Sequence, residues 1–445
     1  MRRLFCVERP GAELLVRGAH VLDPREGIDA RLDVLVRGGE IVALGEELKA
    51  SDGVEVLDGG GRHVLPAFVD PHVHLRTPGQ EYKEDLASGT AAAAAGGYCA
   101  VVAMPNTDPT VDDPSVLRAV CERARREALV PVGFLAAITR GLRGDELTEM
   151  AALRDEGALG FTDDGKPVVA AGMLRRALSY QRLAGGVLAL HEEDPSLSAD
   201  GVMHEGEVSA LLGMAGIPSV SESTCIARDA ALAGYEGGRI HVQHVSARES
   251  VEAIRAAKAA GVRVTAEASP HHLVLTHEEA RSLDTSHKMN PPLRAEEDRR
   301  AVLAALRDGT LDCVATDHAP HARHEKEVPW EQAPMGTTGL ETAFAALHTT
   351  GELPLALLVE RMSADAAEIL DLPVPRVAPG AVANLVLVDL DAEWEVGAHG
   401  YESRSANCCF HGRTLRGRVE LTLAAGAVAF RRAPVQGTAA RGAVV

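Results

Sequence analysis

The middle of the chain alternates short apolar runs with segments whose apolar residues recur at helical spacing. There are eight apolar runs, at residues 63–74, 100–106, 130–138, 158–164, 186–193, 239–246, 263–272 and 312–321. The segments between them resemble "SVEAIRAAKAAG", with a glycine close to the expected end of the helix. Strands separated by helices form parallel sheets, and eight such units are typical of a closed barrel. The pattern therefore predicts an α/β protein with a (β/α)8 TIM-like barrel over residues 63–377.

The two ends of the chain carry a different pattern. Residues 12–62 and 380–431 alternate apolar and polar positions, as in "ARLDVLVRGGEIVALG", and Gly, Asp and Pro interrupt the alternation. This alternation is typical of β-strands joined by turns. We interpret residues 1–62 and 378–445 as one small composite β-sandwich domain built from both ends. The final stretch, "RRAPVQGTAARGAVV", is expected to be loosely ordered.

Composition and charge narrow the class of protein. The chain has 445 residues, 46% of them hydrophobic, and contains no uninterrupted apolar run of membrane-spanning length. Glu8 and Glu13 follow the start too closely for a secretory signal, so we predict a cytoplasmic protein. A formal net charge of -19 disfavours nucleic acid and anionic membranes as partners. It permits a small anionic substrate, because a few buried arginines can reverse the field locally.

Side chains that bind metals follow several of the predicted strands, where barrel enzymes place their chemistry. They are His72 and His74, Asp163 and Asp164, His191, His244, and Asp317. Alternate residues of a strand share a face, so His72 and His74 can reach one ion. A lone H-x-H also fits two histidines without a metal, but such groups at five strand ends favour a metal site. Mixed nitrogen and carboxylate donors suit Zn²⁺ with one position open for water.

Several long motifs resemble one enzyme family. They are "DPHVHLRTPGQEYKEDLASG", "AMPNTDP", "FTDDG", "HEGEVSALLG", "KMNPPLR" and "ATDHAPH". From about residue 12 to about residue 430 the chain is similar to the amidohydrolase superfamily, and within it to the bacterial dihydroorotases of pyrimidine (UMP) biosynthesis. The resemblance implies a barrel with a composite β domain, which is the architecture that the apolar pattern predicts.

The resemblance also implies a metal centre. The implied ligands are His72, His74, Asp164, His191, His244 and Asp317. They would hold one or two Zn²⁺ per chain, with Asp317 acting also as the catalytic acid and base. Many superfamily members have a carboxylated lysine where Asp164 stands here. Lys166 lies beyond the turn glycine and is interpreted as a solvated loop residue.

Further positions are implied to bind the substrate. They are Arg76 for a carboxylate, Asn106 and Asn290 as amide donors, His321 for the same carboxylate, and the backbone of Met335 and Gly336 at the ring edge. A planar guanidinium suits a carboxylate because it binds both oxygens. Two alternatives stay open: a surface salt bridge from Arg76 to Glu81 or Asp85, and a turn-forming role for Asn106.

The implied reaction is the reversible cyclisation of N-carbamoyl-L-aspartate to L-dihydroorotate. One alternative is another cyclic amidohydrolase, such as a hydantoinase or an allantoinase. Hydantoinases and allantoinases usually carry a lysine at the end of the fourth barrel strand. The rings of their substrates lack the carboxylate that Arg76 would hold. A second alternative is a catalytically silent subunit that serves as scaffold for aspartate carbamoyltransferase. Such subunits typically lose metal ligands, whereas all six positions are filled here. Assembly into a homo-oligomer, or with aspartate carbamoyltransferase, is left open.

Overall fold

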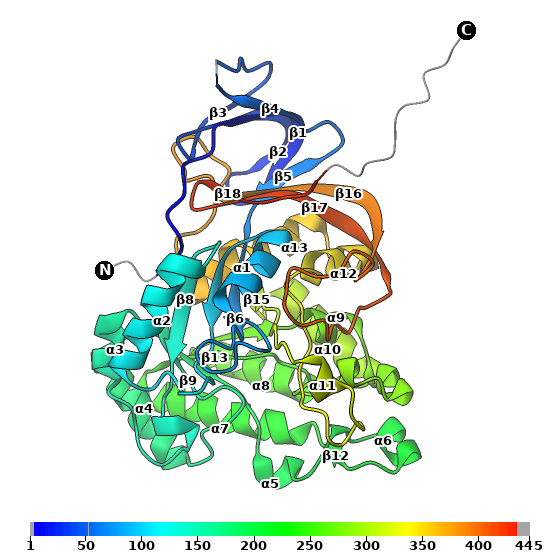
Figure 1. Ribbon diagram of the computed structural model, residues 1–445. Coiled ribbons are helices and arrows are strands. Elements are labelled where there is room, and N and C mark those ends of the chain that lie inside the picture. The colour runs from blue at the N-terminus through cyan, green and yellow to red at the C-terminus, as the bar shows by residue number, and fades with distance from the viewer. Residues whose placement is uncertain (1–3, 52, 434–445) are drawn as a thin grey trace.

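The computed structural model describes residues 4–51 and 53–433 of the chain. The blue strands from the N-terminal part and the orange-to-red strands from the C-terminal part lie together at the top of Figure 1. The middle of the chain forms the barrel beneath them. Most of the tail that was predicted to be loosely ordered, residues 434–445, lies outside the described residues.

Eight parallel strands form the barrel. They are β6 (Phe68–Val73), β7 (Tyr98–Ala103), β8 (Val132–Ala136), β9 (Gly160–Thr162), β10 (Leu188–Leu190), β13 (Arg239–Val242), β14 (Arg263–Ala268) and β15 (Cys313–Val314). They pair in chain order from β6 to β15. The ring closes where Val73 forms a parallel bridge to His318 and the His74 N–H donates to the His318 carbonyl at 2.9 Å. The predicted (β/α)8 barrel is confirmed.

Helices follow most of the barrel strands and cover their outer face (Figure 1). The helices of the barrel are α1 (Leu86–Ala95), α2 (Pro114–Glu127), α3 (Met150–Glu156), α4 (Ala171–Ala184), α7 (Val220–Glu236), α8 (Arg248–Ala259), α10 (Glu296–Asp308), α12 (Ala343–Thr350), α13 (Leu355–Met362) and α14 (Ala364–Ile369). In α2, Asp113 caps the first turn, Pro114 occupies the first helical position, and the buried residues recur at helical spacing.

Short elements lie in the loops near the barrel mouth. They are α5 (Pro195–Ser198), α6 (Glu207–Leu212), α9 (Pro270–Val274), α11 (Arg323–Lys326), the two-residue strands β11 (Met203–His204) and β12 (Gly216–Ile217), and the 3-10 turns at Arg140–Leu142, His277–Ser282 and Thr285–His287. Strands β11 and β12 pair with each other in parallel. Loops that extend beyond barrel strands are where barrel enzymes build their active sites.

Both ends of the chain contribute to one further sheet, as predicted. Its strands are β1 (Leu14–Asp23), β2 (Ile28–Arg37), β3 (Glu40–Gly45), β4 (Glu55–Asp58), β5 (His63–Pro66), β16 (Leu385–Glu395), β17 (Thr414–Ala424) and β18 (Ala427–Arg431). The sheet curls so that β3 meets the segment before β16. There the Ile41 N–H donates to the Ala381 carbonyl at 2.9 Å, and the Ala383 N–H donates to the Gly39 carbonyl at 2.8 Å. The expected sandwich is thus one curled sheet of eight strands around its own apolar core.

The apolar run at residues 63–74, predicted as a single barrel strand, forms two strands in different sheets. Strand β5 pairs with β1 and β16 in the small sheet, whereas β6 pairs with β7 in the barrel. Pro66 has no N–H group to continue the ladder of β5, and the Phe68 N–H donates to the barrel residue Gly97 at 2.9 Å. The chain therefore passes between the sheets at Ala67, later than the boundary predicted after residue 62.

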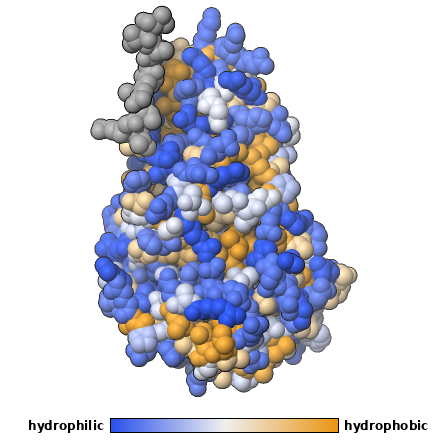
Figure 2. All heavy atoms as spheres, turned by 90° about the vertical axis from the view of Figure 1, so that its right-hand side faces the viewer, coloured by the Kyte–Doolittle hydropathy of each residue, from blue (hydrophilic) through white to orange (hydrophobic). Residues whose placement is uncertain are grey.

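Polar residues cover most of the face shown in Figure 2, in keeping with the large net charge, and apolar residues gather in its middle and near its bottom. A few large apolar side chains are well exposed in the described structure, among them Leu183, Leu211 and Tyr235. Within residues 4–51 and 53–433, no helix has both the length and the apolar character needed to cross a membrane.

Candidate active site

Six strand-end side chains converge at the mouth of the barrel. His72 lies on β6 and His74 just after it, while Asp164, His191, His244 and Asp317 follow β9, β10, β13 and β15. All six are buried, with exposed fractions between 0% and 7%. The potential ligand atoms of His72, His74 and Asp164 lie within 4.8 Å of one another, as do those of Asp164, His191 and His244. The structure therefore brings together every metal ligand that the family resemblance implied.

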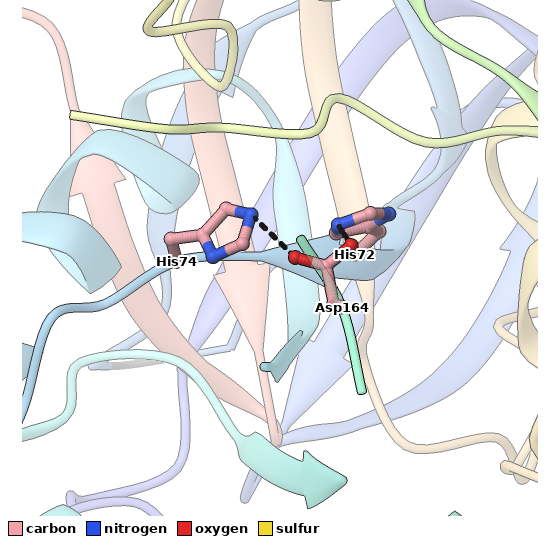
Figure 3. A group of neighbouring side chains, drawn as sticks. All are labelled: His72, His74 and Asp164. Atoms are coloured by element: carbon pink, nitrogen blue, oxygen red, sulfur yellow. Dashed lines mark ion pairs between the residues drawn. The ribbon is translucent and has the colours of Figure 1, made fainter. Parts of the chain in front are cut away.

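The carboxylate of Asp164 lies between two pairs of imidazoles. His72 Nε2 is 3.5 Å from Asp164 Oδ1, and His74 Nε2 is 3.4 Å from Oδ2. Dashed lines in Figure 3 mark these two contacts. His191 Nδ1 and His244 Nε2 lie 3.9 and 3.7 Å from Asp164 Oδ1, the oxygen that also faces His72. A carboxylate in this position can bridge two cations, one for each pair of imidazoles.

Asp317 lies on the side of the first histidine pair. Its Oδ1 is 3.1 Å from His74 Nε2 and 3.4 Å from His72 Nε2. Burial raises the pKa of the Asp317 carboxyl, but the neighbouring charges of His72 and His74 outweigh burial, and its pKa lies below the usual range. The carboxylate is therefore ionised at neutral pH and can accept a proton.

The donor set fits a metal ion. His72 Nε2 is buried, and among the described residues it has no hydrogen-bond partner, although it points at two carboxylates. A buried ring nitrogen without a partner is costly unless a ligand satisfies it. Imidazole nitrogens combined with carboxylate oxygens suit zinc and similar divalent ions. The residues at the barrel mouth can thus hold a cation on each side of Asp164.

The neighbouring acid, Asp163, has a structural role. Its Oδ1 accepts hydrogen bonds from the backbone N–H groups of Ile138 and Thr139, at 2.8 and 3.0 Å. Successive side chains of an extended chain point to opposite sides, so only one acid of "FTDDG" can face the cation. Asp163 connects the ends of β8 and β9, while Asp164 faces the histidines. Lys166 is exposed, in agreement with its interpretation as a loop residue.

Glu267 orients His72, a role that was not predicted from the sequence. Glu267 lies on β14 with its Oε1 2.7 Å from His72 Nδ1 and its Oε2 2.9 Å from His241 Nε2. Burial raises the pKa of Glu267, but His72 and His241 outweigh it and lower the pKa to about 2. The ionised carboxylate holds the proton of His72 on Nδ1 and leaves Nε2 available to a cation. The sequence signal for this role is the position of Glu267 as an acidic residue within the apolar run 263–272.

Asn106 orients the second histidine of the pair. Its Oδ1 is 2.9 Å from His74 Nδ1, and its amide Nδ2 donates to Asp164 Oδ2 at 3.2 Å. The family resemblance implied that Asn106 donates to the substrate. In the structure its amide group connects His74 with Asp164, two of the candidate metal ligands.

Three residues of the site have left-handed backbone conformations. The φ angles are 55° at Arg76, 34° at His244 and 49° at Asp317. Such a conformation costs about 1–3 kcal/mol for a residue other than glycine and persists where the surrounding structure enforces it. These residues lie just beyond β6, β13 and β15, where the chain must turn sharply to aim a side chain over the barrel mouth.

Arg76 is a buried cation beside the metal-binding residues. Its side chain is 8% exposed, and its Nε donates to the Pro320 carbonyl at 3.2 Å. The alternative surface salt bridge from Arg76 to Glu81 or Asp85 does not form. Glu81 instead pairs with Arg123 at 2.6 Å, and Asp85 pairs with Arg404. Within the described part of the chain, the Arg76 guanidinium forms no ion pair. It can therefore receive a carboxylate from a ligand.

The other predicted substrate residues fall into two places. Asn290 lies near the second histidine pair, where its Nδ2 donates to Glu193 at 2.7 Å and Glu193 in turn contacts His191 Nε2 at 3.1 Å. His321 lies on the side of Arg76, and its Nε2 donates to the Met335 carbonyl at 2.9 Å. Gly336 follows directly, at a φ of 141° that favours glycine.

Similarity to known proteins identifies the family. Residues 61–250 match a family described as "Dihydro-orotase-like". A dihydroorotase of Geobacter sp. (strain M21) is 44% identical over 421 residues, which cover 94% of this chain and 99% of that protein. A dihydroorotase of Thermoanaerobacter sp. (strain X514) is 41% identical over 423 residues, covering 94% and 97%. The chain belongs to the dihydroorotase family.

Solved structures show how widely the dihydroorotase fold is shared. L-hydantoinase from Arthrobacter aurescens superposes with a TM-score of 0.84 at 25% identity, covering 96% of this chain and 98% of the hydantoinase. A dihydropyrimidinase from Brevibacillus agri NCHU1002 superposes with a TM-score of 0.81 at 23% identity, covering 94% of this chain and 95% of the dihydropyrimidinase. At this identity the similarity shows a shared fold and nothing about function. The family predicted from the motifs is confirmed, and so is the barrel with its additional sheet.

Proposed function

We propose that this chain catalyses the reversible cyclisation of N-carbamoyl-L-aspartate to L-dihydroorotate. One observation carries the proposal beyond family membership: Arg76 is buried beside the proposed metal-binding residues and has no ion-pair partner among the described residues. Both proposed substrates carry a carboxylate that a guanidinium can bind through two hydrogen bonds. The rings that hydantoinases and allantoinases hydrolyse lack this group.

The proposed cofactor is Zn²⁺, one or two ions per chain. His72, His74, Asp164 and Asp317 would hold one ion, and Asp164, His191 and His244 a second. The position of Asp164 between the two histidine pairs supports two ions. Zinc, when bound, would polarise the substrate carbonyl and lower the pKa of water to about 7.

Asp317 is proposed as the single acid and base. In the direction of hydrolysis, water adds to the ring carbonyl carbon, and the Asp317 carboxylate takes a proton from that water. Asp317 then gives the proton to the ring nitrogen as the carbon–nitrogen bond breaks. Cyclisation follows the same steps in reverse. The Asp317 carboxylate is ionised at neutral pH because the neighbouring histidines lower its pKa, and the ionised form is the one that the proposed base requires.

The remaining residues are proposed to bind the substrate: Arg76 and His321 the carboxylate, Asn106 and Asn290 polar groups, and the backbone of Met335 and Gly336 the ring edge. Burial and the nearby Arg76 charge lower the pKa of His321 to about 2, so the free ring is neutral. Because Nε2 donates to Met335, the neutral ring presents Nδ1 as an acceptor. Direct contact between Nδ1 and a carboxylate would therefore require a second proton on the ring.

A substrate panel combined with metal analysis tests the proposal. The purified chain is assayed in both directions with dihydroorotate and carbamoyl-aspartate, and in hydrolysis with hydantoin, dihydrouracil and allantoin. We expect dihydroorotate to be preferred, activity to disappear on chelation, and zinc to restore it. Faster hydrolysis of hydantoin or allantoin would favour another cyclic amidohydrolase. Full activity without metal would contradict the zinc site, and the absence of both bound zinc and turnover of every substrate would favour the scaffold alternative.

The cytoplasmic location and the modes of assembly stay predictions. The proposed homo-oligomer and the complex with aspartate carbamoyltransferase can be measured by light scattering of the chain alone and mixed with the transcarbamoylase. A change in dihydroorotase activity on mixing would indicate that the complex is functional.

A further inference from the structure

The loop between β16 and β17 leaves the small sheet and reaches the barrel mouth. Its residue Asn407 is 6% exposed and lies against two segments that follow β15. Asn407 Oδ1 accepts a hydrogen bond from the His321 backbone N–H at 3.0 Å. Its Nδ2 donates to the carbonyl of Ala319 at 3.2 Å and to that of Gly336 at 3.1 Å. One side-chain amide thus connects residues 319–321 with residue 336.

The backbone of the same loop strengthens this connection. The Asn407 carbonyl accepts from the Thr338 N–H at 3.1 Å and from Thr337 Oγ1 at 3.0 Å. Thr337 Oγ1 also accepts from the Cys409 N–H at 2.9 Å. Closer to β16, the Ser403 N–H donates to Glu341 at 3.1 Å. The loop is therefore attached to the barrel on both sides of Asn407, which holds the amide in place.

The segments that Asn407 connects carry the proposed carboxylate-binding groups. Arg76 Nε donates to the carbonyl of Pro320, between the two residues that Asn407 contacts. His321 Nε2 donates to the carbonyl of Met335, the neighbour of Gly336. A shift of either segment would therefore displace the guanidinium, the imidazole or the ring-edge backbone. Within the described part of the chain, the Asn407 side chain forms its hydrogen bonds with residues 319, 321 and 336 and none with the six proposed metal-binding residues.

We propose that Asn407 is a positioning residue that sets the geometry of the substrate-binding half of the site without affecting the metal-binding half. The proposal rests on the proposed roles of Arg76, His321 and Gly336. Its chemical basis is that the side-chain amide of Asn407 forms three hydrogen bonds, each to a different backbone group. A residue more than 60 positions away in sequence from these segments thus determines where the substrate carboxylate binds.

The substitution Asn407→Asp tests the proposal, because it replaces two N–H donors with acceptors that face carbonyl oxygens. We expect the KM for dihydroorotate to rise about tenfold, as for one or two lost hydrogen bonds, with kcat changed less than about threefold and metal content unchanged. Asn384→Asp is the matched control. Asn384 Oδ1 accepts one hydrogen bond from the Ala425 N–H within the small sheet, and its substitution should leave KM unchanged. Equal KM values for wild type and Asn407→Asp would overturn the proposal.

Asn407→Ala and amide hydrogen exchange extend the test if Asn407→Asp does not fold. Alanine removes the two bonds donated by Nδ2 and also the bond that Oδ1 accepts from the His321 N–H, without adding a charge, and we expect the same split between KM and kcat. Exchange should accelerate at residues 319–321 and 336–338 but not at the strand ends that carry the metal-binding histidines. Unchanged exchange in these two segments would contradict the proposal even if the wild-type chain does not hydrolyse dihydroorotate. A wild type without this activity would instead overturn the proposed function, so the two failures are distinguishable.

Discussion

The proposed metal-binding half and the proposed substrate-binding half of the site are built in different ways. The metal-binding side chains lie at the ends of parallel strands or directly beyond them, and buried neighbours such as Glu267 orient them. Arg76 and His321 lie on loops, and they are held through backbone carbonyls and through Asn407. Strand ends obtain their positions from the barrel itself, whereas loops need additional bonds. Substitutions in the two halves should therefore affect different kinetic constants.

The largest effect is expected at Asp317 in the metal-binding half. Asp317→Asn should lower kcat by about 10²- to 10⁴-fold, because the proposed proton carrier is lost while the histidines and Asp164 remain. Steady-state kinetics and metal analysis measure this. Lys166→Ala is the control, since this exposed lysine lies two positions beyond Asp164 and should retain wild-type activity. Wild-type turnover in Asp317→Asn would remove Asp317 from the mechanism.

Substitution of Glu267 should affect the metal and leave the binding of substrate to loaded enzyme nearly unchanged. Glu267→Gln keeps the size of the side chain but removes the charge that orients His72, so we expect zinc affinity to fall 10- to 100-fold. Competition with a chromogenic chelator measures the affinity. Thr265→Val, which removes the hydrogen bond to the far nitrogen of His241, serves as a milder comparison and should change the affinity less than about threefold. Unchanged zinc affinity in Glu267→Gln would show that the barrel alone orients His72.

Substitution of Arg76 should have the opposite profile. Arg76→Ala should raise the KM for dihydroorotate about tenfold or more at unchanged metal content, because a charge-assisted pair of hydrogen bonds to the carboxylate is lost. Arg76→Lys should recover part of the affinity, since an ammonium keeps the charge without the planar pair of donors. An unchanged KM in Arg76→Ala would place the carboxylate elsewhere and would end the division into two halves.

The smallest effect concerns Glu341, which anchors the loop that carries Asn407. Burial raises the pKa of Glu341 from 4.5 to about 7, so the folded state binds the proton more tightly than the unfolded state. Its contribution to stability is present below about pH 4.5 and is lost as the pH rises through about 7. The free energy of unfolding is measured with urea at pH 5 and at pH 8. Between these two pH values, wild type should lose on the order of 1 kcal/mol more than Glu341→Gln. An equal difference at both pH values would contradict the raised pKa.

Much of the barrel and the metal-binding set could be predicted because their signals are local. Apolar runs alternating with helical segments predict the strands, and the spacing of His72 and His74 places both on one face. The roles of Arg76, Asn106 and His321 depended on resemblance, because loops have no periodicity from which a direction can be derived. Glu267 was missed because it lies within an apolar run, and its apolar neighbours predict a buried strand without showing what its carboxylate contacts.

The sequence by itself determined that eight apolar runs contribute the barrel strands and which polar residues follow them, since hydrophobic periodicity and turn residues act over a few positions. Only the tertiary structure decided that Asp164 faces four histidines, that the chain changes sheets at Ala67, and that Asn407 contacts residues 319 and 336. These contacts join positions far apart in the chain. They depend on how the barrel closes and how the sheet curls, which no local pattern specifies.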